Sequence, residues 1–193
     1  MTRIGFAYNQ KPDPVAAHNA TELARADEEP PSSGSALATL RVPASAASND
    51  EFAEWDAPAT IDAVANALAQ CGDVIRLEAT DDFPLRLRDT RPDIVFNIAE
   101  GLRGPNRESH VPAICEFYGV PYTGSDPFAL ALCLEKSRTK EVLRARGVPT
   151  ADWWLVRSRA DVARLISHLP ALPLFAKPVH EGSSKGITEK NFV

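Results

Sequence analysis

Short apolar runs alternate with amphipathic stretches along most of the chain. Residues 3–8 (RIGFAY) and 93–98 (DIVFNI) are almost continuously apolar, which is typical of strands buried on both faces of a parallel sheet. Between such runs, apolar residues recur at helical spacing, as in Ile61, Val64 and Leu68. This alternation predicts an α/β fold with an open parallel sheet. We expect strands at 3–8, 74–77, 93–98 and 120–123. We expect one helix that Asp56 caps, and two more that begin at Phe83 and Asn106.

A turn at residues 124–127 (GSDP) separates this pattern from a second one. The later part predicts helices at 128–133, at 135–146 and from a Ser158 cap to about His168, with short strands at 153–156 and 173–176. We therefore divide the chain into an N-terminal α/β domain, residues 1–124, and the first part of a second, α+β domain, residues 125–193.

A long polar tract interrupts the first domain between residues 9 and 50. It is rich in alanine, proline, serine and acidic residues and lacks apolar periodicity. Such a segment buries too little apolar surface to offset the entropy of ordering it. The composition predicts a disordered surface insertion.

Composition narrows the class of protein. The 193 residues are 44% hydrophobic, which is enough for a sizeable core, and the net charge of −5 argues against a general nucleic-acid surface. No apolar run approaches the ~18 residues of a membrane span. The three cysteines lie in apolar patterns without metal-ligand spacing, so we expect buried thiols in a reducing, cytoplasmic protein.

The clearest candidate for chemistry is the stretch from Lys177 to Gly186. Lys177 ends an apolar run, Pro178 follows it, and residues 181–186 (EGSSKG) form a loop of small residues. Such a loop can bring backbone N–H groups and two hydroxyls close to a phosphate, while a lysine supplies positive charge. On the loop alone, a plain glycine–serine turn is the simpler interpretation.

Two further groups of polar residues follow predicted elements. Asn97, Glu100 and Gly101 come directly after the central strand, where ligands of open α/β sheets bind, and an amide with a carboxylate there could hold an amino group. Lys136 and Lys140 lie one helical turn apart, so an anion nearby is one interpretation and a solvated basic face is the other.

Taken together, these motifs resemble the ATP-grasp enzymes, and most closely the D-alanine–D-alanine ligases. Ligases of that group carry Lys-Pro followed by Glu-Gly-Ser-Ser-x-Gly, which matches Lys177-Pro178 and residues 181–186 in order and spacing. A ligase-like sub-group also has Phe-Asn-Ile-Ala-Glu-Gly, here residues 96–101, followed by Arg-Glu and a Val-Pro-Ala helix, here 107–108 and 111–113. The resemblance covers the first strand and about residues 52–187.

The resemblance implies an ATP- and Mg²⁺-dependent ligase that joins two amino acids through an acylphosphate, as in peptidoglycan biosynthesis. Ser183 then matches the family serine that orients the substrate. Ligases of this type often form homodimers, and neither a membrane nor a nucleic-acid partner is expected. The implied ATP-binding residues are Lys136, Lys177, Glu181, Gly182, Ser183, Ser184 and Gly186, and the implied substrate-binding residues are Asn97, Glu100 and Gly101.

Two departures from the family pattern affect this interpretation. The ligases carry a glutamate shortly after the first strand, which binds the ammonium of the first amino acid, but residues 9–13 (NQKPD) offer no match. The magnesium ligands of the family have no counterpart before Val193, so we assign no metal ligand within the chain and expect it to represent the N-terminal half of a ligase. The alternative is a non-catalytic α/β binding module, in which the glycine–serine loop is only a turn.

Overall fold

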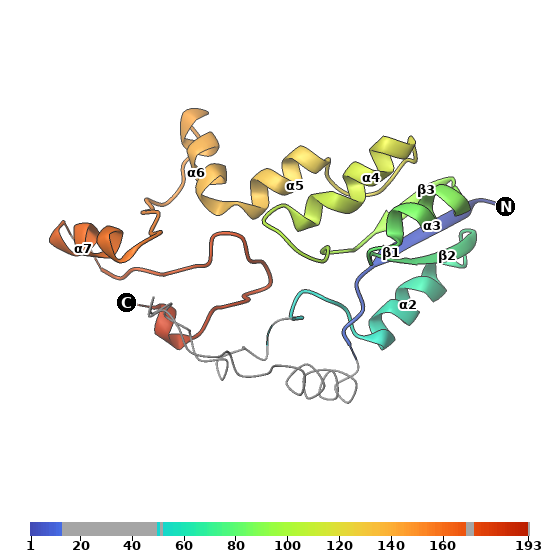
Figure 1. Cartoon of the computed structure of the whole chain (residues 1–193), viewed down its shortest axis with the longest axis horizontal. Helices are drawn as coiled ribbons and strands as arrows, with labels where there is room; N and C mark the ends of the chain where they lie inside the picture. The colour runs from blue at the N-terminus through green and yellow to red at the C-terminus, as the bar shows by residue number, and fades with distance from the viewer. Residues whose placement is uncertain (13–49, 51, 169–171, 193) are drawn as a thin grey trace, which may run out of the picture.

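The computed structural model describes residues 1–12, 50, 52–168 and 172–192. Most of the predicted insertion, residues 13–49, lies outside the described residues. The prediction that it is disordered therefore concerns residues that the structure does not describe. Figure 1 shows the sheet near the N-terminus and a succession of helices that leads away from it.

The sheet confirms the predicted α/β class. Strands β1 (Arg3–Tyr8), β2 (Asp73–Glu78) and β3 (Ile94–Asn97) are all parallel, in the order β2-β1-β3. The strand expected at 120–123 is reduced to a single parallel bridge between Val95 and Tyr122. β1 is therefore the central strand, which explains why five of its six residues are buried.

Helices cover both faces of this sheet (Figure 1). Helix α2 (Pro58–Leu68) packs on the face that carries Phe6 and Tyr8, whereas α3 (Phe83–Thr90) and α4 (His110–Tyr118) pack on the other face, in the core that includes Ala7. Successive residues of β1 thus enter two different cores, as the period of two along a strand requires.

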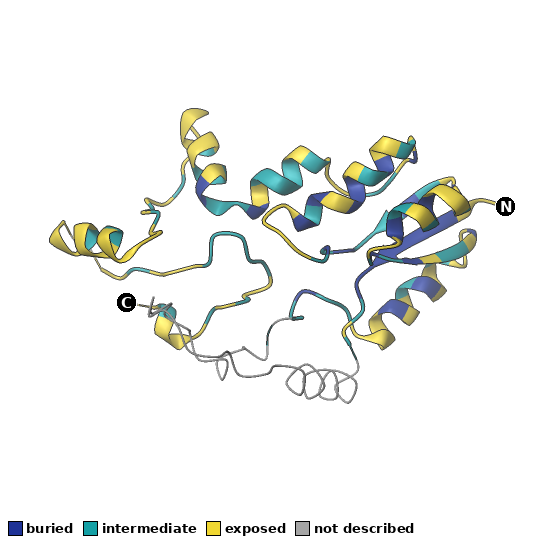
Figure 2. Cartoon of the chain, viewed as in Figure 1, coloured by how far each residue is buried: buried dark blue, intermediate teal, exposed yellow. Residues whose placement is uncertain are grey.

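The part of the chain after residue 124 is helical and more exposed. It contains α5 (Pro127–Leu134), α6 (Lys136–Ala145), α7 (Arg159–Ser167) and the short 3-10 helix η3 (Glu189–Asn191). Ser158 caps α7 as predicted, since its hydroxyl accepts a hydrogen bond from the Asp161 N–H. Figure 2 shows that buried residues concentrate around the sheet, whereas α7 and the segment after it are mostly exposed. The division at residues 124–125 stays a prediction.

Several local predictions are wrong. The apolar segments 153–156 and 173–176 are not strands, apart from one antiparallel bridge between Phe175 and Phe192. No partner strand lies beside either segment within the described residues, so their apolar character alone does not produce a ladder. Ala57, rather than Asp56, is the N-cap of α2, and no side chain caps this helix.

The cysteine prediction is correct only in part. Cys115 is buried in α4, and burial raises the pKa of its thiol to about 12. Cys71 and Cys133 are exposed, so the expectation of buried thiols is wrong for these two.

Candidate functional site

The carboxyl ends of the strands are joined by Asn9, which directly follows β1. Its amide nitrogen donates to the Ala79 carbonyl at 3.2 Å, and its Oδ1 accepts from the Gly101 N–H at 2.8 Å. Asn9 is only 1% exposed. One side chain thus fixes the loops after β2 and β3 to the end of β1, and this gives the site a rigid floor.

A cavity of about 690 Å³ opens at these strand ends. Asn97 and Glu100, two of the predicted substrate-binding residues, line it together with Ser183 of the glycine–serine loop. Gly101 does not line this cavity, and its N–H donates to Asn9 instead. The cavity is therefore lined both by the end of β3 and by the 181–186 loop, which follows more than 80 positions later in the sequence.

The walls of this cavity carry several carboxylates, and the pKa values of two of them, Glu100 and Glu108, are raised. Burial, reinforced by the neighbouring carboxylates of Glu108 and Glu54, raises the pKa of Glu100 to about 7. Burial also raises the pKa of Glu108, where Arg107 acts in the opposite direction. A cationic group, such as the ammonium of an amino acid, would relieve this repulsion.

A second cavity, of about 200 Å³, lies under the 181–186 loop. Lys136 and Lys177 both line it, with Glu181, Gly182, Ser183 and Ser184. Six of the seven predicted ATP-binding residues therefore surround one space. Its volume is below the roughly 300–1,000 Å³ of sites for whole small molecules, so it suits phosphate groups rather than an entire nucleotide.

The loop itself has an unusual backbone. Ser183 and Ser184 have φ values of 43° and 62°, in the left-handed region that is costly for residues other than glycine. They are the two central residues of a tight turn, closed by the Lys185 N–H donating to the Gly182 carbonyl at 2.8 Å; such turns need positive φ at both positions, where glycine, asparagine and aspartate rather than serine are usual. Strain of this kind concentrates at functional sites, which favours a binding role for the loop.

Lys136 is the first residue of α6 and holds the segment before the loop. Its Nζ donates to the Val179 carbonyl at 3.4 Å and also contacts the Glu181 carbonyl. Burial, followed by repulsion from Lys177, lowers the pKa of Lys136. Lys140 turns away from this cavity and donates to Thr150 Oγ1 at 2.9 Å.

The two loop glycines donate to carboxylates of the segment that precedes α2. The Gly182 N–H donates to Glu54 Oε1 at 2.7 Å, and the Gly186 N–H donates to Asp50 Oδ2 at 2.8 Å. Gly186, the seventh predicted ATP-binding residue, does not line the cavity; a Cβ at that position would lie 2.9 Å from Pro178 Cγ.

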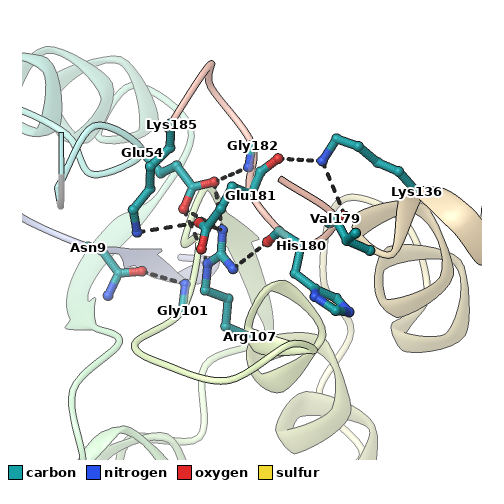
Figure 3. A network of polar contacts seen from close by, with 10 residues as sticks. All are labelled: Asn9, Glu54, Gly101, Arg107, Lys136, Val179, His180, Glu181, Gly182 and Lys185. Carbon is teal, nitrogen blue, oxygen red and sulfur yellow. Dashed lines mark hydrogen bonds and ion pairs between the residues drawn. The ribbon is translucent and has the colours of Figure 1, made fainter. Parts of the chain in front are cut away.

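A buried ion pair between Arg107 and Glu54 stands at the centre of the polar network in Figure 3. Arg107 Nη2 lies 2.7 Å from Glu54 Oε1 and 2.6 Å from Oε2, and the two side chains are only 8% and 3% exposed. Both oxygens of the Glu54 carboxylate thus pair with Arg107, and Oε1 also accepts the Gly182 N–H.

Sequence reasoning assigned no role to Asn9, Glu54 or Arg107. Glu54 was missed because residues 13–49 separate it from β1 in the sequence, although it lies in the turn shortly before the Ala57 N-cap of α2. Arg107 entered the sequence analysis only as part of the Arg-Glu motif. The one feature that could have indicated its role is its position between a glycine-containing loop and an apolar helix.

No group of three or more His, Cys, Asp or Glu residues is arranged to hold a metal ion in the part of the chain that the structure describes. Among the same residues, no helix is both long enough and apolar enough to cross a membrane.

The curated proteins that are similar to this chain in sequence are D-alanine–D-alanine ligases. No protein-family model matches the chain. Over 130 residues it is 37% identical to D-alanine–D-alanine ligase B of Pseudomonas putida, a match that covers 67% of this chain and 40% of that protein. Over 126 residues it is 36% identical to the D-alanine–D-alanine ligase of Aquifex aeolicus, covering 65% of this chain and 42% of that protein. The chain thus spans about 40% of the length of these curated relatives.

Solved structures share the fold. The D-alanine–D-alanine ligase of Helicobacter pylori superposes with a TM-score of 0.56 at 14% identity, covering 97% of this chain and 58% of that one. The D-alanyl-alanine synthetase A of Vibrio cholerae superposes with a TM-score of 0.55 at 14% identity, covering 95% and 50%. At this identity the similarity concerns the fold.

Proposed function

The chain belongs with the D-alanine–D-alanine ligase-like ATP-grasp proteins, as a homologue of their N-terminal part, and we infer that it provides the amino-acid cavity and the phosphate-covering loop of such a ligase. The reaction we assign is ATP-dependent formation of a dipeptide. The carboxylate of one amino acid is phosphorylated, and the amine of a second attacks the acylphosphate and releases phosphate.

One observation carries this proposal. Ser183 lines both the cavity of about 690 Å³ at the strand ends and the cavity of about 200 Å³ under the loop. A substrate carboxylate in the first cavity and a terminal phosphate in the second would meet at this serine. Phosphoryl transfer depends mainly on such positioning and on charge stabilisation.

The residues divide the work by charge. Lys136 and Lys177 would neutralise the phosphates of ATP, and the hydroxyls and N–H groups of Ser183 and Ser184 would orient the transferring group. Glu100, with Asn97, would hold the ammonium of the amino acid in the carboxylate-lined cavity. ATP supplies the phosphoryl group, and the use of Mg²⁺ with it stays a prediction from the family resemblance.

Cytoplasmic location, expected from the cysteine pattern, and a homodimer, implied by the family resemblance, stay predictions. D-Alanine is the substrate that the relatives' names suggest, and it is the first one to test.

The test compares two lysines in the polypeptide expressed with whatever residues its reading frame places after Val193. With D-alanine and ATP, we expect dipeptide and phosphate to form together. Lys177→Ala should lower kcat/KM for ATP by about 10- to 100-fold, because a charge-assisted phosphate contact is worth roughly 1.5–3 kcal/mol. Lys136→Ala should do likewise, and the two losses should not add, since both lysines serve one ligand.

Lys190→Ala is the matched control, because Lys190 lies in η3 and does not line the cavity. Equal kcat/KM for all these variants would contradict the proposal, and so would phosphate release without dipeptide. Binding of ATP and D-alanine without turnover in that polypeptide would favour the alternative, a non-catalytic binding module.

A further inference from the structure

Arg107 uses its guanidinium to connect three separate segments. Besides Glu54, it contacts two residues that precede or begin the glycine–serine loop: Nη1 donates to the His180 carbonyl at 2.8 Å, and Nη2 lies 3.1 Å from Glu181 Oε2 (Figure 3). Arg107 itself belongs to η2 (Arg107–Ser109), directly before α4. The side chain therefore links the sheet domain to the chain that covers the second cavity.

Glu54 transmits this link into the loop. Its carboxylate accepts from Arg107 Nε at 3.2 Å while it also accepts the Gly182 N–H at 2.7 Å. The position of Arg107 thus sets the position of Glu54, which in turn fixes Gly182, the residue next to Ser183. A planar guanidinium with five N–H donors can satisfy all these acceptors at once, whereas an ammonium cannot.

Glu181 is held from two sides. Arg107 contacts its carboxylate, and Lys136 contacts its backbone carbonyl. Lys185 lies 3.4 Å from the same carboxylate, so the loop also closes on itself. With Glu181 and Gly182 both anchored, Ser183 has little freedom to move between the two cavities.

We propose that Arg107 is a positioning residue that holds the 181–186 loop over the second cavity, by bridging Glu54 to His180 and Glu181. The importance of this role for catalysis rests on the proposed function. The bridge itself, which is the set of contacts from Arg107 to Glu54, His180 and Glu181, can be tested without measuring turnover. Arg107 contacts no substrate in this scheme; it acts through Glu54 and the loop.

The primary test is hydrogen exchange of the backbone amides in residues 179–186, with β1 as the internal reference. In Arg107→Met we expect exchange in this segment to accelerate by about tenfold or more, with β1 unchanged. Arg107→Lys should retain the fold and give an intermediate rate, because one ammonium can pair with Glu54 but cannot span all three partners. Arg103→Met is the matched control, since the exposed Arg103 pairs only with Asp81 among the described residues.

Arg107→Met leaves Glu54 buried without its partner and could unfold the chain. Glu181→Gln avoids this problem, because it weakens the contact to the loop and leaves the Arg107–Glu54 pair intact. It should also accelerate exchange in residues 179–186 without changing β1. If the loop exchanges at the wild-type rate in Arg107→Lys and Glu181→Gln, the proposal is wrong. It is equally wrong if β1 accelerates in step with the loop.

Binding of ATP, measured by titration calorimetry, separates this proposal from the proposed function. Arg107→Lys should weaken ATP binding by roughly tenfold, with Arg103→Met equal to wild type. If the wild-type protein fails to bind ATP while the exchange results hold, the proposed function fails and the bridge stands. If ATP binding is unaffected by Arg107→Lys although exchange accelerates, Arg107 does not position the loop for its ligand, and the proposal is overturned.

Discussion

Glu100 is the residue with the clearest expected effect of pH. Burial and the carboxylates of Glu108 and Glu54 raise its pKa from 4.5 to about 7. Between these two values the folded protein holds a proton that the unfolded chain releases. Folding stability from this group is therefore present below about pH 4.5 and is lost as pH rises through about 7.

We predict that Glu100→Gln removes part of this loss. Thermal unfolding followed by circular dichroism at about pH 5.5 and about pH 8 should show a difference in Tm that is smaller in the variant by roughly 3 °C or more. Glu141→Gln makes the same chemical change on an exposed ion pair of α6 and should leave the difference as in wild type. A difference in Tm that Glu100→Gln does not alter would mean that this carboxyl titrates normally in the folded state.

Among the elements, the loop from β3 to η2 depends on one close backbone approach. A Cβ at Gly101 would lie 2.2 Å from the Arg107 carbonyl oxygen, and Gly101 has a φ of 79°. Gly104, in the same loop, has a φ of 93° but meets nothing within 4 Å. The two glycines therefore separate the cost of backbone conformation from the cost of steric overlap.

We predict that Gly104→Ala costs about 1–2 kcal/mol of unfolding free energy, from its positive φ alone. Gly101→Ala should cost at least about 2 kcal/mol more, because the loop must move away from Arg107. Urea unfolding measures both values. Equal costs would show that the loop relaxes freely, which would also weaken the argument that Arg107 occupies a fixed position.

The sequence allowed elements to be predicted where an apolar pattern coincides with a partner. The runs that became β1, β2 and β3 pair with one another, and the lysines and serines of the second cavity belong to short motifs with fixed spacing. The apolar segments 153–156 and 173–176 have no ladder beside them among the described residues, so the pattern there indicated strands that do not form. An apolar pattern indicates that a segment tends to be buried, whereas a strand also needs a partner strand with which to form hydrogen bonds.

Long-range contacts in the site were beyond the reach of local patterns. Arg107 and Glu54 are separated by 53 positions, and Glu54 and Gly182 by 128. A buried ion pair leaves no periodic signal in the sequence, because each partner alone resembles an ordinary surface charge. Only the fold brings these residues together.

At the scale of the whole molecule, packing is distributed unevenly. The buried hydrophobic residues before residue 125 include Phe6, Ile61, Leu77 and Val95, each 0% exposed. After that point, among the described residues, only Leu134 and Ser137 are buried. The sheet domain should therefore carry most of the stability, while the candidate phosphate-binding loop lies in the less stable part.

We predict that two valine substitutions respond very differently. Val95 in β3 is 0% exposed and belongs to the core between the sheet and helices α3 and α4, whereas Val162 in α7 is 42% exposed. Val95→Ala should cost about 2–4 kcal/mol and lower Tm by roughly 5–10 °C, because it leaves a cavity in close-packed surroundings. Val162→Ala, the same chemical change, should stay within about 0.5 kcal/mol of wild type. Hydrogen exchange gives a second measurement. Backbone amides in β1 should exchange slowly, at a rate set by global unfolding, whereas those in α7 should exchange fast, through local opening. Equal sensitivity of Tm to the two substitutions would mean that both parts unfold as one unit with comparable packing, and the uneven distribution of burial would then not determine stability.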